Sequence, residues 1–232
     1  MATDRELMRM HVEALFTHDA NGRMVRVNEP GGARAPRFFL GRTAHGGVWR
    51  FRDDLDDAVV RELDALCRAE PAGDEFLAAP YGAAPYEALL ARHAPVERTE
   101  AGPAYVCPPE LGDASGVVRV TEQNTGLLRP HLEAWLGDVP TRQPMRAVVV
   151  DGRAVSLCAS VRITPAADEA GVETARDFRG RGHAARAVAA WAAEVRGLGR
   201  VPLYSTSWRN TASQALARSL RLRRFGADLH IT

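Results

Sequence analysis

Residues 171–195, GVETARDFRGRGHAARAVAAWAAEV, join a short apolar strand to a long alanine-rich helix through a turn that contains two glycines. Gly180 and Gly182 can adopt backbone angles that are closed to other residues, and they let a ligand approach the main chain. The helix predicted over residues 181–196 would present its first unpaired N–H groups and the positive end of its dipole beside this turn. The stretch therefore predicts a site for an anion such as a pyrophosphate.

The composition of the 232-residue chain is that of an ordinary soluble globular protein, with 46% hydrophobic and 25% charged residues. This length allows one large domain or two modest ones. A formal net charge of +1 gives no reason to expect nucleic acid as a partner. We find no apolar run long enough for a bilayer and no secretory signal, so we expect a cytoplasmic protein without a membrane partner.

The cysteine and lysine contents exclude several kinds of chemistry. Cys67, Cys107 and Cys158 lie far apart and in no CxxC pattern, which favours reduced, buried thiols over a disulfide frame or a zinc site. We therefore predict no metal site. The chain contains no lysine, which excludes a Schiff-base lysine, pyridoxal-phosphate chemistry and a P-loop of the usual kind.

Residues 1–100 are predicted to form a small antiparallel sheet-and-helix domain. After a polar amino-terminal segment, Asn21-Gly22 lies between two apolar segments, which is a strong hairpin signal, and a second strand pair is expected at 38–40 and 48–51. Together these segments suggest one sheet of about four strands.

A helix is expected to cover one face of this sheet, and a second helix is expected to follow it. The first would be capped by Asp53 or Asp54, and the second would start near Pro85 and bury Leu89 and Leu90. The sheet carries aromatic residues that could line a ligand-binding face, although packing in the core is the favoured interpretation: Phe38, Phe39, Trp49 and Phe51.

Residues 101–232 are predicted to form an α/β domain with a mixed sheet and helices on both faces. Connecting segments are expected at 70–85 and 95–116. A helix is expected after the strand 117–120, because four apolar residues would share one of its faces: Leu128, Leu132, Trp135 and Leu136. The pair Asp151-Gly152 predicts a hairpin between strands 145–150 and 154–163. Further strands are expected at 171–174, 203–206 and 225–231, and a last helix at 210–220.

The sequence GRGHAA, residues 180–185, matches the GxGxxA pattern of dinucleotide sites. Two features count against such a site. The polar residues 175–179 separate the strand from the first glycine, and the next strand, 203–206, ends without the carboxylate that would hold a ribose. An NAD(P)-dependent oxidoreductase remains an alternative, as does a purely structural role of the glycines in strand-to-helix packing.

A wider resemblance favours another ligand. RGRGHA, residues 179–184, resembles the arginine-or-glutamine, x, x, glycine, x, glycine-or-alanine signature of the GCN5-related N-acetyltransferase (GNAT) family, which also follows a strand and opens a helix. NTASQALARSL, residues 210–220, resembles a later family helix that begins with asparagine and has a small residue at its fourth position. The resemblance covers roughly residues 117–232 and implies a mixed, mostly antiparallel GNAT-like sheet flanked by helices. For residues 1–100 we recognise no family.

The resemblance implies acetyl-CoA as the co-substrate. The pyrophosphate would lie against the turn formed by Arg179, Gly180, Arg181, Gly182, His183 and Ala184. The strand residues Val172, Glu173 and Thr174 match the family strand that pairs with the pantetheine arm. Asn210 and Ser213 match positions that face this arm, although helix capping alone would also explain Asn210.

The implied activity is N-acetyl transfer to an amine of a small molecule, peptide or protein by direct attack. Glu173 is the candidate base, because it is the only carboxylate on the predicted strand 171–174 beside the expected thioester, although a solvated or salt-bridged role is an equal alternative. Many family members carry a tyrosine that protonates the departing thiolate, and here Ala217 stands in its place. Ser213 and Tyr204 are the nearest substitutes, and a CoA-binding protein without turnover is the second alternative. Residues 1–100 would shape the acceptor pocket or form an oligomer contact, such as that of a homodimer.

Overall fold

The computed structural model describes residues 2–73 and 82–232, so part of the connecting segment expected at 70–85 lies outside the described residues. The chain forms two compact units. The first contains the described residues of Met1–Tyr105 together with Ser205–Thr211 and Arg224–Thr232. The second contains Val106–Tyr204 and Ala212–Arg223.

The first unit begins with a helix that the polar amino-terminal segment did not predict. Helix α1, Asp4–Leu15, starts with a capping box in which the Thr3 and Glu6 side chains bond each other's backbone N–H groups. Strands β1, Phe16–His18, and β2, Met24–Val27, follow as an antiparallel pair, which confirms the predicted hairpin.

The main sheet of this unit has the strand order β4-β3-β11-β5. Its strands are β3 (Phe38–Thr43), β4 (Gly46–Phe51), β5 (Thr99–Val106) and β11 (Arg223–Ile231). The expectation of one sheet from the first four strands is wrong, because β1 and β2 form a separate sheet. On the side away from β4, β3 instead pairs antiparallel with β11, the last strand of the chain. Strand β5 lies in the segment 95–116, which was expected to be a connection.

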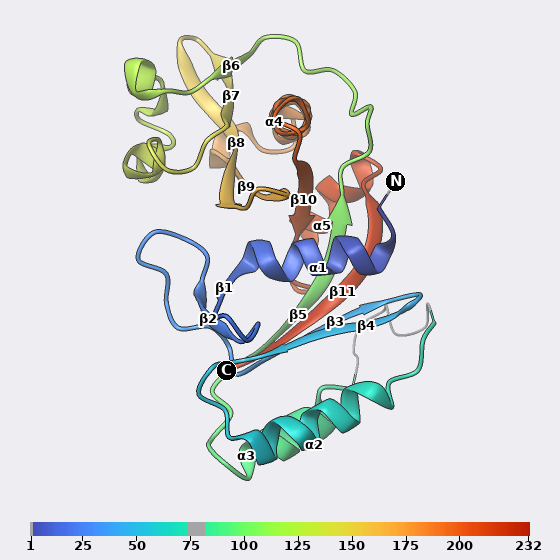
Figure 1. Cartoon of the computed structure of the whole chain (residues 1–232). Helices are drawn as coiled ribbons and strands as arrows, with labels where there is room; N and C mark the ends of the chain where they lie inside the picture. The colour runs from blue at the N-terminus through green and yellow to red at the C-terminus, as the bar shows by residue number, and fades with distance from the viewer. Residues whose placement is uncertain (1, 74–81) are drawn as a thin grey trace. The chain divides into compact units, whose positions relative to one another are not determined.

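Helices cover both faces of this sheet (Figure 1). Phe38 and Leu40 pack with α2, Asp57–Arg68, and α3, Ala84–Ala91, whereas Phe39 faces His11 of α1. Side chains on a strand alternate between faces, so neighbouring phenylalanines enter different cores. Phe38 and Phe39 are fully buried, and Trp49 and Phe51 pack against the core beside Phe38, which confirms the core interpretation of the aromatic residues.

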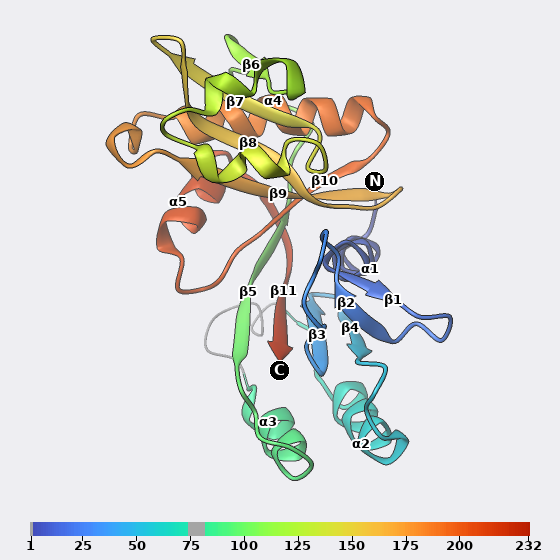
Figure 2. The same cartoon turned by 90° about the vertical axis from the view of Figure 1, so that its left-hand side faces the viewer.

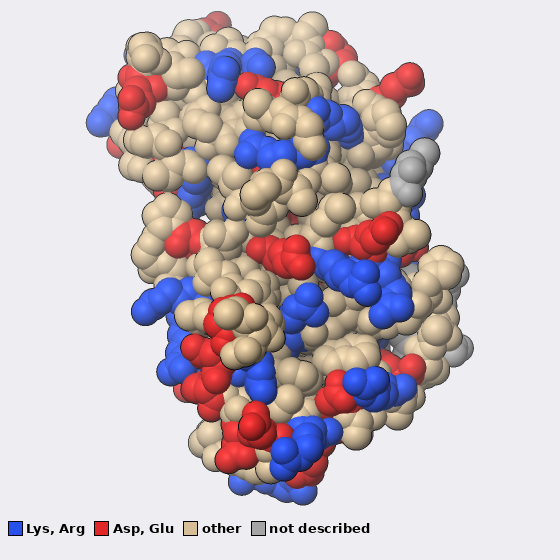
Figure 3. Space-filling model, in the orientation of Figure 1, with Lys and Arg blue, Asp and Glu red and all other residues tan. Residues whose placement is uncertain are grey.

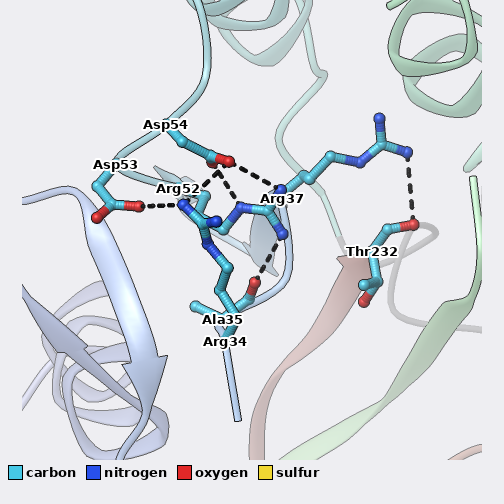
Figure 4. Close-up of polar contacts among 7 residues, drawn as sticks. All are labelled: Arg34, Ala35, Arg37, Arg52, Asp53, Asp54 and Thr232. Carbon is cyan, nitrogen blue, oxygen red and sulfur yellow. Dashed lines mark hydrogen bonds and ion pairs between the residues drawn. The ribbon is translucent and has the colours of Figure 1, made fainter. Parts of the chain in front are cut away.

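The cap of α2 differs from the prediction. Asp56 caps this helix, because its carboxylate accepts a hydrogen bond from a first-turn N–H at 2.8 Å. Asp53 and Asp54 bind arginines instead: Asp53 Oδ1 lies 3.4 Å from Arg34 Nη2, and Asp54 Oδ1 lies 2.6 Å from Arg52 Nε (Figure 4). The expected helix start near Pro85 is confirmed by α3, which buries Leu89 and Leu90.

The sheet of the second unit has the strand order β10-β9-β8-β7-β6. Its strands are β6 (Val117–Arg119), β7 (Met145–Val150), β8 (Arg153–Ile163), β9 (Ala167–Thr174) and β10 (Val201–Ser205). All pairs are antiparallel except β9 with β10, which is parallel. The predicted turn between β7 and β8 is confirmed, with φ of 48° at Asp151 and 74° at Gly152. Helix α4, His183–Gly197, packs on β7, β8 and β9.

The opposite face of β7 and β8 is covered by two short 3-10 helices, η2 (Glu122–Leu128) and η3 (Glu133–Asp138), which lie in front of the strands in Figure 2. The single helix predicted here is wrong, because Pro130 lacks an N–H and its ring is incompatible with a helix interior. The apolar face was nevertheless predicted correctly: Leu128, Leu132, Trp135 and Leu136 all pack in this core.

The three cysteines are free and buried, as predicted. Burial raises the pKa of the Cys67 and Cys107 thiols to about 12. None of the described helices is long and apolar enough to cross a bilayer. Arginine and acidic side chains are interspersed over the face drawn in Figure 3.

A buried ionic contact ties α1 to β11. His11 Nε2 lies 2.6 Å from Asp228 Oδ2, and the His11 side chain is fully buried. Burial by itself raises the pKa of Asp228, but the neighbouring His230 and the hydrogen bond from His11 lower it, and the net shift is downward. Folding therefore favours the charged form of the Asp228 carboxylate.

We expect Asp228→Asn to lower the free energy of unfolding at pH 7 by about 3 kcal/mol, because it leaves His11 buried without its charged partner. The pKa of Asp228 is lowered on folding, so this stabilisation is complete above the unfolded value of about 3.9 and is lost as the pH falls through the folded value. Urea unfolding at pH 7 and in an acidic series measures both effects. Asp57→Asn, which removes an exposed ion pair with Arg23, is the control and should cost less than about 1 kcal/mol. Equal losses in the two variants would contradict the assignment.

Candidate functional site

An open strand edge lies beside the glycine turn. Parallel pairing joins β10 to β9 only at Ala167, Asp168 and Glu169. On its other side β9 stays paired with β8 as far as Thr174. In the described part of the chain, residues 170–174 therefore have no strand partner on the β10 side.

The ladder between β8 and β9 determines which backbone groups face this edge. Ala175 N donates to Val155 O at 2.9 Å, so residue 175 belongs to a hydrogen-bonded pair. Hydrogen-bonded and non-hydrogen-bonded pairs alternate in an antiparallel ladder. The N–H and C=O groups of Val172 and Thr174 consequently point away from β8 into the open edge, whereas those of Glu173 point toward β8.

The turn after β9 is held in a fixed shape by its own arginines. Arg179 Nε donates to Thr174 O at 3.2 Å, and Arg181 Nη2 donates to Asp177 O at 2.9 Å. The Arg181 guanidinium also lies over the Phe178 ring, 5.3 Å from its centre. Both arginines remain exposed, so they add positive charge at the turn while they stabilise it.

The amino terminus of α4 offers free donors. Gly182, with φ of 78°, is the residue before the helix and provides no side-chain cap. The first intrahelical bond is from Arg186 N to Gly182 O, and among the described residues the N–H groups of His183, Ala184 and Ala185 have no acceptor. Unpaired N–H groups at a helix start are suited to hydrogen bonding with an anion. Burial, Arg186 and Arg181 lower the pKa of His183, which favours the neutral form of its ring.

Glu173 lies on the face of β9 that looks toward η3. Trp135 Nε1 donates to Glu173 Oε2 at 2.5 Å. The Ser156 hydroxyl donates to Glu173 O at 3.1 Å and lies 2.8 Å from Thr174 Oγ1. Sequence reasoning placed Trp135 in the core only and missed this contact. An aromatic residue with a polar N–H next to a core position was the available signal.

The predicted site residues at the last helix belong to different units of the chain. Helix α5, Thr211–Ser219, buries Ala217, and the Ser213 hydroxyl lies 2.5 Å from Tyr204 Oη. Asn210 is exposed directly before α5 and belongs to the first unit, whereas the other predicted site residues belong to the second. Across residues 2–73 and 82–232, no group of three or more histidine, cysteine or acidic side chains is arranged to hold a metal.

Comparisons with known proteins identify the fold. Neither a model of a known protein family nor a curated protein matches the sequence. A GCN5-related N-acetyltransferase from Kribbella flavida matches with a TM-score of 0.50 and 15% identity over 99% of this chain and 94% of that one. A GNAT-family structure from Novosphingobium aromaticivorans gives 0.49 and 25% identity, and the match covers 59% of this chain and 65% of that one. An acetyltransferase of the GNAT family from Colwellia psychrerythraea gives 0.49 and 12% identity over 79% and 75%.

The match along nearly the whole of the Kribbella flavida protein shows that this chain has the GNAT fold. The predicted fold class, a mixed and mostly antiparallel sheet flanked by helices with a smaller amino-terminal sheet and helices, is confirmed.

The left-handed backbone conformation of Gly182, at the start of α4, can be tested by measuring the free energy of unfolding of a substituted chain. We expect Gly182→Ala to lower the free energy of unfolding by about 1 kcal/mol, because a Cβ is disfavoured at positive φ. Gly197→Ala in the same helix is the control: Gly197 has open space around it and no positive φ, so alanine should stabilise by about 0.5 to 1 kcal/mol. Denaturant unfolding of both variants measures the difference, and equal effects would exclude the left-handed turn.

Proposed function

We propose that the protein is an N-acetyltransferase that transfers the acetyl group of acetyl-CoA to an amine of a small molecule, peptide or protein. The observation that carries the proposal is the open edge of β9, which runs into a turn and helix start with free N–H groups. An extended ligand with an anionic end suits this arrangement. Pyrophosphate at the α4 start and a peptide-like pantetheine arm along β9 satisfy both parts.

Individual backbone groups fit the coenzyme. The N–H groups of His183, Ala184 and Ala185 would bind phosphate oxygens, with Arg179 and Arg181 adding charge. Because the Thr174 carbonyl already accepts from Arg179, Val172 and Thr174 together leave three groups for the amides of the pantetheine arm: Val172 N–H, Val172 C=O and Thr174 N–H.

The acetyl thioester supplies an activated carbonyl carbon for the acceptor nitrogen. A backbone N–H at the open edge, such as that of Val172, would stabilise the negative charge that develops on the thioester oxygen. Glu173 would take the proton from the acceptor ammonium and so free the nitrogen lone pair.

Direct attack is favoured over a covalent enzyme intermediate. Cys158, which pairs with Val172 across β8 and β9, is fully buried, and burial raises the pKa of its thiol well above the ordinary value. A buried, protonated thiol is a poor nucleophile. Cys67 and Cys107 are buried in the same way, so none of the three cysteines suits acyl transfer through the enzyme.

Protonation of the departing thiolate would fall to the Tyr204 and Ser213 pair. Their hydroxyl oxygens are 2.5 Å apart, whereas Ala217, at the usual tyrosine position, is buried and has no donor. General acid assistance is typically worth about a hundred- to ten-thousandfold, and coenzyme A is already a good leaving group. The chain is therefore compatible with turnover without the usual tyrosine.

Ligand binding and turnover test the proposal together. We expect acetyl-CoA to raise the melting temperature and NAD(P) to have no effect, and we expect thiol release with at least one member of a panel of amines, amino acids and peptides. Stabilisation by NAD(P) alone would favour the oxidoreductase. Stabilisation by acetyl-CoA without thiol release from any acceptor would favour a CoA-binding protein.

The role of Glu173 has its own test. We expect Glu173→Gln to lower kcat by about a hundredfold or more, because the amide cannot accept the ammonium proton. Acetyl-CoA affinity, measured by calorimetry, should stay within about twofold, since the backbone of Glu173 faces β8. Glu133→Gln is the matched control, an exposed carboxylate on η3 that pairs with Arg129, and should leave kcat unchanged. An unchanged rate in Glu173→Gln would remove Glu173 as the base.

A further inference from the structure

The Trp135 indole approaches β9 where the strand lacks a side chain. Gly171 and Glu173 are two residues apart, so they share one face of β9. A Cβ atom on Gly171 would lie 3.1 Å from Trp135 Cη2 and 2.2 Å from Val161 Cγ1. Glycine at position 171 therefore leaves the space that brings the indole against the strand, within reach of the Glu173 carboxylate.

Other residues also contact the Trp135 indole and stabilise its position. The Arg142 guanidinium lies over the Trp135 ring, 5.6 Å from its centre. Arg142 Nε is in turn 3.2 Å from Asp138 Oδ1, in the same segment as Trp135. Trp135 is half-buried and packs against the core between η3 and the sheet. Contacts that do not involve Glu173 therefore also restrict the position of the indole.

The direction of this hydrogen bond distinguishes the two oxygens of Glu173. An indole N–H can donate but cannot accept. Glu173 Oε2 must therefore be the acceptor of the Trp135 bond. Oε1 has no hydrogen-bond partner within residues 2–73 and 82–232, so it is the oxygen left to receive a proton.

We propose that Trp135 is the positioning residue of the base, an inference that rests on the proposed acetyl transfer. The indole holds Oε2 and thereby directs Oε1 at the acceptor ammonium. In the step that follows, one N–H bond of the ammonium breaks, its electron pair stays on nitrogen, and the proton forms a bond with Oε1. The freed nitrogen then carries the lone pair needed for attack on the thioester, while Trp135 keeps its own proton.

Two substitutions of Trp135 separate the donor from the ring. Trp135→Phe keeps an aromatic ring under Arg142 but removes the N–H. Trp135→His removes the outer ring but keeps a donor, because the imidazole overlays the five-membered half of the indole and places Nε2 at the position of the indole nitrogen. At pH 8 the imidazole is neutral, since its ordinary pKa is about 6.5.

We expect Trp135→Phe to lower kcat by about ten- to a hundredfold, the range for loss of a hydrogen bond to a charged group, with KM for acetyl-CoA within about twofold. Trp135→His should retain kcat to within about threefold even where its melting temperature is lower. In a Glu173→Gln background, Trp135→Phe should change kcat by less than about twofold, because a residue that acts through Glu173 has nothing left to position.

Trp191→Phe is the control for the loss of a buried indole donor. Trp191 Nε1 donates to Ser160 Oγ at 2.9 Å. This variant should lower the melting temperature and leave kcat unchanged, which separates stability from rate.

The outcomes distinguish this inference from the proposed function. An active wild type with an unaffected Trp135→Phe, or full additivity with Glu173→Gln, would overturn the positioning role alone. A parallel loss of kcat and melting temperature in Phe and His variants alike would assign Trp135 to packing and also overturn it. A wild type that transfers acetyl to no acceptor would overturn the proposed function, and the positioning role with it.

Discussion

Parallel pairing between β9 and β10 ends at Glu169, at the point where β8 carries an extra residue. Ser160 pairs with Ala170 and Arg162 with Glu169, so Val161 has no partner of its own in the ladder. A bulge of this kind bends its strand and increases the local twist. Because β9 stays paired with β8 along residues 168–174, it follows that bend and parts from β10. The open edge, and any ligand that binds along it, therefore depends on one inserted residue in the neighbouring strand.

The closed end of β9 is held by a buried polar group. The fully buried Asp168 accepts from Ser160 Oγ at 2.6 Å and forms an ion pair with Arg200 Nε at 3.1 Å. Burial raises the pKa of Asp168, although Ser160 and Arg200 act in the opposite direction. The network joins β8 and β9 with Arg200, the residue that leads into β10. Buried polar groups of this kind are costly unless they are paired, so they fix the point up to which the two strands remain together.

Local features of the sequence could predict the glycine turn, α4 and the Asp151-Gly152 hairpin, because each depends on neighbouring residues. The place of β11 could not be predicted, because its partner β3 lies at the other end of the chain. The capping box of Thr3 and Glu6 was a readable signal for α1 within a segment that looked merely polar. The bulge at Val161 leaves no trace in the apolar pattern of β8, and the contact between Trp135 and Glu173 requires that two distant segments pack.

Successive residues at the end of β9 point their backbone and side-chain groups in different directions, so they could take different roles. Val172 and Thr174 turn their backbone groups into the open edge, while the residue between them sends its carboxylate out of the plane of the sheet toward Trp135. A coenzyme arm and a base can therefore occupy adjoining residues without competing for the same groups. A shift of one residue in the pairing with β8 would exchange the faces and the edges together, which would leave Glu173 on the α4 side and its backbone in the edge. The pairing register between β8 and β9 thus determines both the direction of the Glu173 carboxylate and which backbone N–H groups face the open edge.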